Sequence, residues 1–264
     1  MIDVGAITHE VRLGDCLDDI SGLAALPDQS IDHACFDPPY EKEAHTKQVR
    51  ASNKGPGHGQ SNAVPFELDF AAITEQERNA IAAHLARVVR RWTLTFCQAE
   101  GLHLWRAAFE TAGMSWRRAG LWVKPDAQPQ LTGDRPGTGA ESIAIAHAKG
   151  RSRWNGGGRP GVWTFPKNEQ GREHPTQKPL MLMEALIRDF TDPGDLILDL
   201  MAGSGSTGVA CRRLGRRFLG WERKPAYHAI AARRIVGAQE QLSLIGHRKT
   251  PGPKQSDLLL TETS

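Results

Sequence analysis

The segment Asp37-Pro38-Pro39-Tyr40 holds the side chains of this sequence that are best suited to chemistry. It ends the apolar run 31–36, so a buried strand is expected to deliver it to the edge of a sheet. Each proline fixes its own φ and pushes the preceding residue toward extended backbone, which stiffens the segment before a ligand binds. A carboxylate, a proline carbonyl and an aromatic ring then provide two acceptors and a stacking face. This set fits a flat base with an exocyclic amino group; the alternative is an ordinary Pro-Pro turn.

The glycine pattern Gly203-x-Gly205-x-x-Gly208 is the second candidate site, and it lies between an expected strand and an expected helix. Glycines let the backbone approach a ligand, and the N-terminus of a helix supplies N–H donors. Glu222 ends the next expected strand, 19 positions after Gly203. An acid at that distance contacts the ribose of a bound nucleotide cofactor, so the pattern predicts a nucleotide-cofactor loop.

Two cofactors fit this loop. A dehydrogenase that binds NAD would need several further strand-helix units, whereas only about forty residues follow Glu222. Asp199, four positions before Gly203, adds a carboxylate suited to a cationic amino-acid group. S-adenosylmethionine carries such a group and is the expected cofactor, with a NAD-dependent oxidoreductase as the alternative class.

An α/β arrangement must position these two segments. Thr74 and Glu77 have the spacing of a capping box at the start of one of the expected helices. The hydrophobic patterns predict strands and helices, with strands at 9–14, 31–36, 92–97, 115–124, 142–147, 196–200 and 217–222, and helices at 74–91, 102–112, 179–191, 209–214 and 225–242.

The composition is that of a globular protein, with 39% hydrophobic and 24% charged residues among 264. We expect one domain over residues 1–245, a flexible tail at 246–264, no membrane span and, because the N-terminus lacks a signal pattern, a cytoplasmic location. The cysteines lack metal-site spacing and are expected to be reduced core thiols, with no metal bound; they are Cys16, Cys35, Cys97 and Cys211.

Basic charge gathers in segments without regular periodicity. Residues 41–62 are rich in lysine and glycine, which fits a lid, a binding loop or disorder, and the charge favours contact with DNA. Between Lys149 and Lys178 there are seven lysines or arginines against two glutamates. We interpret 150–173 as a nucleic-acid surface rather than an irregular surface loop, and 41–62 and 126–173 as DNA-recognition loops.

Together the motifs resemble the amino-group DNA methyltransferases of the beta arrangement, in which the catalytic segment precedes the cofactor loop. The segment 174–179 (His-Pro-Thr-Gln-Lys-Pro) is similar to the family's border of the methionine end of the cofactor, and Leu121-Trp122-Val123-Lys124-Pro125 and Glu141-Ser142-Ile143 resemble its middle motifs. The resemblance implies a seven-stranded, mostly parallel, Rossmann-like sheet with helices on both faces and a circularly permuted motif order. It also implies double-stranded DNA as partner and leaves a homodimer and a restriction partner open.

By this resemblance, Asp37 and the Pro38 carbonyl would accept the two amino hydrogens of a base flipped out of DNA, and Tyr40 would stack on it. Aspartate at the first position of the tetrapeptide is associated with adenine N6 and serine with cytosine N4. Methyl transfer to adenine N6 is therefore expected, with cytosine N4 as the alternative. Transfer to RNA or to a protein amide, and a noncatalytic DNA-binding module, are further alternatives that the basic loops and the cofactor loop disfavour.

The cofactor would be held from several segments. Asp15 would take the adenine amino group, unless it instead caps a helix at 16–23. Glu222 would take the ribose, and Thr176 and Lys178 the methionine side, although Lys178 is equally interpretable as a surface charge. The remaining predicted contacts are Asp199 with Gly203 and Gly205 at the amino-acid end, and Cys16, Asp37, Ala202, Ser204, Ser206, Thr207 and Arg223.

Overall fold

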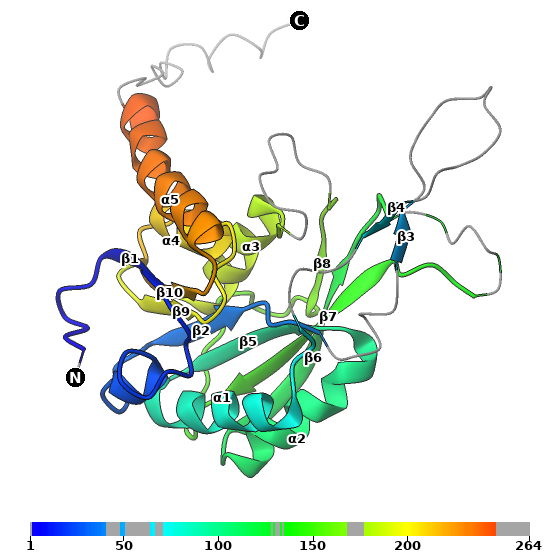
Figure 1. Cartoon of the computed structure of the whole chain (residues 1–264), viewed down its shortest axis with the longest axis horizontal. Coiled ribbons are helices and arrows are strands. Elements are labelled where there is room, and N and C mark those ends of the chain that lie inside the picture. Colours follow the sequence, from blue (N-terminus) through cyan, green and yellow to red (C-terminus); the bar gives the residue numbers. More distant parts are fainter. Residues whose placement is uncertain are drawn as a thin grey trace, which may run out of the picture.

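A central sheet of eight strands organises the chain in the computed structural model, which describes residues 2–40, 48–50, 64–66, 71–127, 129, 133, 135–167 and 177–246 (Figure 1). The strand order is β1-β10-β9-β2-β5-β7-β6-β8. The strands are β1 (His9–Leu13), β2 (His33–Phe36), β5 (Trp92–Cys97), β6 (Ser115–Val123), β7 (Ala140–His147), β8 (Val162–Thr164), β9 (Leu196–Asp199) and β10 (Arg217–Glu222). The helices are α1 (Glu75–Val88), α2 (Leu102–Thr111), α3 (Leu180–Phe190), α4 (Ser206–Arg213) and α5 (Pro225–Gly246), with short 3-10 turns η1 (Leu23–Ala25) and η3 (Ala99–Gly101).

The sheet is mostly parallel. Only β7 runs against its neighbours, because it pairs antiparallel with both β5 and β6. The predicted α/β class and mostly parallel sheet are thus confirmed, but the predicted number of strands, seven, is wrong. The eighth strand, β8, lies inside the segment 150–173, for which the sequence indicated no element. It pairs with β6 over three residues, a length too short to show a periodicity of two.

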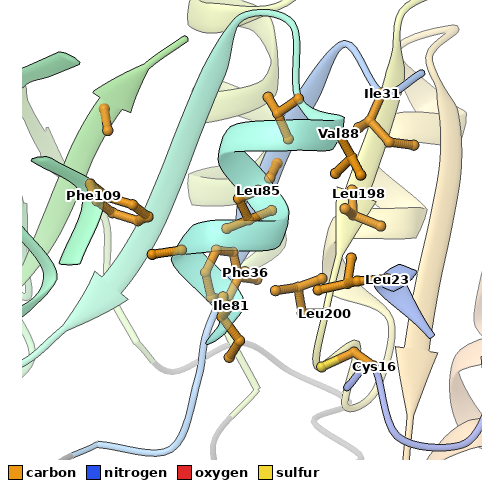
Figure 2. Packing of buried hydrophobic residues seen from close by; sticks show 14 of the residues in the cluster. Cys16, Leu23, Ile31, Phe36, Ile81, Leu85, Val88, Phe109, Leu198 and Leu200 are labelled. Atoms are coloured by element: carbon orange, nitrogen blue, oxygen red, sulfur yellow. The ribbon is translucent and has the colours of Figure 1, made fainter. Parts of the chain in front are cut away.

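Helices cover both faces of this sheet, as predicted (Figure 1). Successive residues of β2 point to opposite faces: Phe36 packs in the core with α1 and α2, while Cys35 packs in the core with α3, α4 and α5. Both faces of the central strands are therefore buried, which explains their nearly continuous apolar sequences. Figure 2 shows the first of these cores, where Leu85 and Val88 of α1 lie beside Ile31 and Leu198.

The helix at 16–23, which was the alternative explanation of Asp15 as a helix cap, does not form. Only the 3-10 turn η1 forms there, because side chains bind the backbone N–H groups that a helix would use. The Asp15 carboxylate accepts a hydrogen bond from Leu17 N, and Asp18 accepts from the N–H groups of Ile20 and Ser21. Asp15 thus caps a turn at the end of β1 instead of a helix.

Other predicted element boundaries differ from the observed ones by a few residues. The capping box at Thr74 is confirmed, but α1 ends at Val88 rather than residue 91. Helix α5 continues to Gly246 instead of residue 242. Part of the segment 41–62 forms a strand, β3 (Gln48–Arg50), which pairs antiparallel with β4 (Val64–Phe66). The rest of that segment, and residues 247–264 of the predicted tail, lie outside the described residues.

The four cysteines are buried and unbonded to one another, as predicted for core thiols. Within the described ranges, none of the helices has the length and apolar character needed to cross a lipid bilayer.

Candidate active site

Four adjacent strands bring the predicted site residues to one edge of the sheet. β1, β10, β9 and β2 are parallel neighbours, so their carboxyl ends lie at the same edge. Asp15, Glu222, Asp199 and Asp37 each stand at or just beyond the end of one of these strands. The helix after β9 covers one face of the sheet and the helix after β2 covers the other. The chain therefore leaves neighbouring strands in opposite directions, which opens the crevice where ligands of such folds bind.

A cavity of about 460 Å³ occupies this edge, within the usual range for small-ligand sites. The predicted residues that line it are Asp15, Cys16, Asp37, Pro39, Lys178, Asp199, Ala202, Gly203, Ser204, Ser206, Thr207, Glu222 and Arg223. Pro38, Tyr40 and Gly205 lie beside the cavity without lining it, and Thr176 lies outside the described residues. Asp37 and Gly203, far apart in the sequence, thus share one cavity.

The glycine loop turns sharply between β9 and α4. Gly203 has a φ of 53° and Gly205 a φ of 80°, both in the left-handed region that glycine favours. A Cβ on Gly205 would lie 2.9 Å from the Cβ of Ala231, so this glycine also allows α5 to pack closely against the loop. Both constraints concern the backbone, which explains why the spacing of these glycines was readable in the sequence.

Glu222 fastens the loop from the end of β10. Its Oε2 accepts a hydrogen bond from Gly203 N at 2.8 Å, and its Oε1 accepts one from Lys224 N at 2.8 Å. Each carboxylate oxygen can accept a second hydrogen bond. Glu222 can therefore hold the loop and still bind the hydroxyl groups of a ligand.

Asp199 is the most deeply buried acid of the cavity, with 3% of its surface exposed. Burial raises its pKa to about 7, hydrogen bonds from Thr207 and Met201 oppose the rise, and the nearby carboxylates of Asp37 and Glu222 add to it. A cation bound beside Asp199 would favour its ionised form. The group is thus suited to receive a positively charged part of a ligand.

The lining as a whole has a surplus of negative charge. Three basic side chains, Lys178, Arg223 and Lys224, face the five acidic side chains of Asp15, Asp37, Glu77, Asp199 and Glu222. Such a lining favours a ligand with net positive charge over one with a pyrophosphate group.

Asp37 and Tyr40 belong to a network of charged side chains beside the cavity. Lys178 Nζ lies 2.6 Å from Asp37 Oδ2 and 3.1 Å from Glu141 Oε2. The hydroxyl of Tyr40 donates to Glu141 Oε2 at 2.8 Å, and Lys124 Nζ donates to Glu141 Oε1 at 2.5 Å. The segment 37–40 is thus fixed by residues from three other parts of the chain.

Glu141 and Lys124 were not predicted as site residues. Although burial favours the neutral acid, Lys178 and Lys124 hold the pKa of Glu141 down at about 2, so Glu141 is ionised. The sequence did offer one indication of these two residues, because they lie in the two stretches that resemble middle motifs of the family. Nothing in their spacing indicated that they meet Tyr40.

Lys178 also lies differently from its predicted role. It lines the cavity, but its ammonium is directed at two carboxylates of the protein. Its contact with the methionine end of a cofactor stays a prediction, while the alternative of an exposed surface charge is wrong because its side chain is 10% exposed.

In the described part of the basic segment 150–173, the two tryptophans pack inward while the arginines are exposed. Trp163 is 5% exposed, and its indole donates to Asp189 at 2.9 Å. Trp154 packs edge-on against Phe190 of α3. The two rings pack inward, whereas Arg151, Arg153 and Arg159 are exposed and stay candidates for contact with DNA.

Comparison with known proteins shows which proteins this chain is similar to. The family model N6_N4_Mtase, described as DNA methylase, matches residues 147–233. The resemblance to amino-group DNA methyltransferases is confirmed. The matched residues include the cofactor loop and Glu222 but not the segment 37–40.

Two curated methylases are similar in sequence. The Type II methyltransferase M.XycI of Xanthomonas campestris pv. cyanopsidis is 33% identical over 147 residues, which are 50% of this chain and 49% of M.XycI. This chain therefore spans about half the length of that relative. The putative methylase YubD of Escherichia coli (strain K12) is 28% identical over 236 residues, which are 87% of this chain and 91% of YubD.

Solved methyltransferases share the fold. M1.HpyAVI in complex with SAM has a TM-score of 0.64 at 23% identity, covering 86% of this chain and 98% of that one. The PvuII DNA methyltransferase, described as cytosine-N4-specific, has a TM-score of 0.65 at 15% identity and covers 91% of this chain and 92% of that one. The predicted Rossmann-like methyltransferase fold is thereby confirmed.

Proposed function

We propose that this protein transfers a methyl group from S-adenosylmethionine to the N6 amino group of an adenine flipped out of double-stranded DNA. The observation that carries the proposal is the shared cavity, in which the catalytic segment at Asp37 meets the cofactor loop at Gly203. The related M.XycI is by its name a type II methyltransferase, and the M1.HpyAVI structure is a complex with SAM. Both support a methyl-transfer reaction, and the matching family model, described as DNA methylase, supports DNA as its substrate.

The cavity fits the proposed cofactor. S-adenosylmethionine has a sulfonium and an ammonium against a single carboxylate, and the lining carries a surplus of acids. Asp199 suits the ammonium, Glu222 the ribose hydroxyls and Asp15 the adenine amino group. NAD fits less well, because its pyrophosphate would enter an acidic cavity, and α5 is the only element after β10 in the described chain. When bound, S-adenosylmethionine supplies a methyl group activated by its sulfonium.

The protein's own contribution is to hold the base. A base inside a duplex cannot reach a buried donor, so it must be extruded into the site. Asp37 Oδ1 and the Pro38 carbonyl accept the two amino hydrogens and so orient the nitrogen lone pair toward the methyl group. The hydrogen bond from Tyr40 to Glu141 fixes the ring on which the base stacks. The reaction would need positioning and electrostatics and no covalent enzyme intermediate: the bond from nitrogen to the methyl group would form as the methyl–sulfur bond breaks, and the nitrogen would lose one amino proton during or after attack.

Recognition of DNA is assigned to the two basic segments 41–62 and 126–173. The preference for adenine rests on the aspartate at the head of the tetrapeptide. A cytoplasmic location, a homodimer and a restriction partner stay predictions.

The test is methyl transfer to DNA from labelled S-adenosylmethionine, followed by digestion and identification of the modified nucleoside. N6-methyladenine is the expected product. N4-methylcytosine would refute the choice of base while keeping the reaction type. Stabilisation of the protein against heat by NAD but not by S-adenosylmethionine would instead favour the oxidoreductase.

A second test concerns Asp37. Asp37→Ala should abolish methyl transfer, whereas Asp19→Ala, which removes an exposed carboxylate, should leave it unchanged. Near-normal transfer by Asp37→Ala would refute the role assigned to this residue.

A further inference from the structure

The ammonium of Lys178 is enclosed at the base of the catalytic segment. The side chain is 10% exposed and enters from the turn before α3. Its Nζ lies 4.8 Å from the ring centroid of Phe96 and 5.7 Å from that of Tyr40. Aromatic rings at these distances stabilise a cation that has lost its water.

All three hydrogens of this ammonium have acceptors. They are Asp37 Oδ2 at 2.6 Å, Glu141 Oε2 at 3.1 Å and the Tyr40 hydroxyl oxygen at 3.4 Å. Because the Tyr40 hydroxyl donates its own hydrogen to Glu141, its oxygen can accept from Lys178. Lys178 is therefore a fully engaged donor whose partners are the two side chains of the catalytic segment and Glu141.

The two oxygens of Asp37 differ as a result. Oδ2 is occupied by Lys178, whereas Oδ1 is buried and has no hydrogen-bond partner among the described residues. A buried carboxylate oxygen without a donor costs stability, so such oxygens are rare unless a ligand supplies the donor. Asp37 lines the cavity, so a ligand that bound there with a donor beside this carboxylate would supply the missing partner.

We propose that Lys178, anchored by Glu141, is the positioning residue of Asp37: it binds Oδ2 and leaves Oδ1 as the oxygen that receives the amino hydrogen of the target base. This inference rests on the proposed function and deepens it. It assigns Lys178 to the base side of the site, in place of the cofactor contact expected from the sequence. It also gives Glu141 a role, because the charge of Glu141 holds Lys178 between the two acids.

The charge of Lys178 also keeps Asp37 an acceptor. Burial raises the pKa of Asp37, and the adjacent ammonium opposes that rise. The charged or titratable groups around Asp37 are Lys178, Glu141 with Lys124 behind it, Tyr40 and, from β9, Asp199. Lys178 is the cation in direct contact, so removing it leaves Asp37 facing mostly acids. The protonated form of Asp37 then becomes more populated. A protonated Asp37 cannot accept two donors as the ionised form does.

The experiment compares the wild-type protein with Lys178→Met, which keeps the side chain as far as its ε-carbon position and removes the charge, and with Lys178→Arg. The control is Arg106→Met, which removes a positive charge from the exposed ion pair with Glu110 on α2. Methyl transfer is measured against pH, the affinity for S-adenosylmethionine by calorimetry, and the titration of Asp37 by carbon NMR of labelled carboxyl groups, with Asp37→Asn to assign the signal.

Lys178→Met is expected to lower kcat at pH 7 by about a hundredfold, in the range of one lost charged hydrogen bond. In Lys178→Met, the acid limb of the profile of kcat against pH should move to higher pH, and so should the pH at which the Asp37 carboxyl signal titrates. The affinity for S-adenosylmethionine should be nearly unchanged. Lys178→Arg should restore part of kcat and of the normal pH profile. Arg106→Met should behave as the wild type.

Two results would overturn the inference. One is an Asp37 signal that titrates at the same pH in Lys178→Met and the wild type. The other is a loss confined to cofactor affinity, which would return Lys178 to the cofactor. A wild-type protein that methylates no DNA would instead defeat the proposed function, and the NMR titration would still decide whether Lys178 sets the ionisation of Asp37.

Discussion

Replacing Asp199 by asparagine should stabilise the protein without S-adenosylmethionine while weakening its binding of S-adenosylmethionine. Burial raises the pKa of Asp199 from an ordinary value of 3.8 to about 7. Between these two pH values the folded protein keeps a proton that the unfolded chain has released. The free energy of unfolding therefore falls as the pH rises through this window. A shift of about three pKa units at about 1.4 kcal/mol each sets an upper bound of about 4 kcal/mol on this loss.

The asparagine of the Asp199→Asn variant would have no charge to bury, and its side-chain oxygen can still accept the hydrogen bond from Met201 N. Urea unfolding followed by tryptophan fluorescence should show little difference between Asp199→Asn and the wild type near pH 4. By pH 8 the variant should be more stable by up to about 4 kcal/mol. In calorimetry the variant should bind S-adenosylmethionine at least tenfold more weakly, because it offers no charge to the ammonium.

Asp19→Asn is the matched control, since Asp19 is exposed, and it should change stability by no more than about 0.5 kcal/mol at either pH. A stability difference between Asp199→Asn and the wild type that does not change with pH would refute the reasoning. So would a variant that is less stable than the wild type at pH 8.

Three further predictions concern the loop and α1. Gly205→Ala should lower the free energy of unfolding in urea by about 1–3 kcal/mol, because it places a Cβ at a φ of 80° and 2.9 Å from Ala231; wild-type stability would contradict the strain. Glu222→Ala should weaken S-adenosylmethionine binding about tenfold or more by calorimetry, because the loop loses the acceptor of Gly203 N; unchanged affinity would remove Glu222 from the site. Thr74→Ala should lower the thermal stability by about 1 kcal/mol through loss of the helix cap, while methyl transfer at low temperature stays at the wild-type level; a loss of transfer there would mean that the cap shapes the cavity.

The sequence by itself determined the elements and the motifs that depend on the backbone. Strands such as β5 are read directly because both of their faces are buried and the apolar run is continuous. The glycine loop is readable because left-handed backbone and close packing both demand glycine at fixed positions. The segment 37–40 is readable because its two prolines fix the local backbone between an aspartate and a tyrosine. Elements without such a local sequence pattern, such as the three-residue β8, could not be predicted from the sequence.

Only the tertiary structure decided which side chains meet. Because β7 runs against its neighbours, it begins where β5 and β6 end, and so Glu141 arrives at the same edge of the sheet as Asp37 and Lys124. The pairing of Asp37 with Lys178, and the lack of a partner for Asp37 Oδ1 among the described residues, were likewise visible only in the folded chain. Charge pairing acts through space and leaves no spacing in the sequence, so the motifs could name the participants of the site but not their contacts.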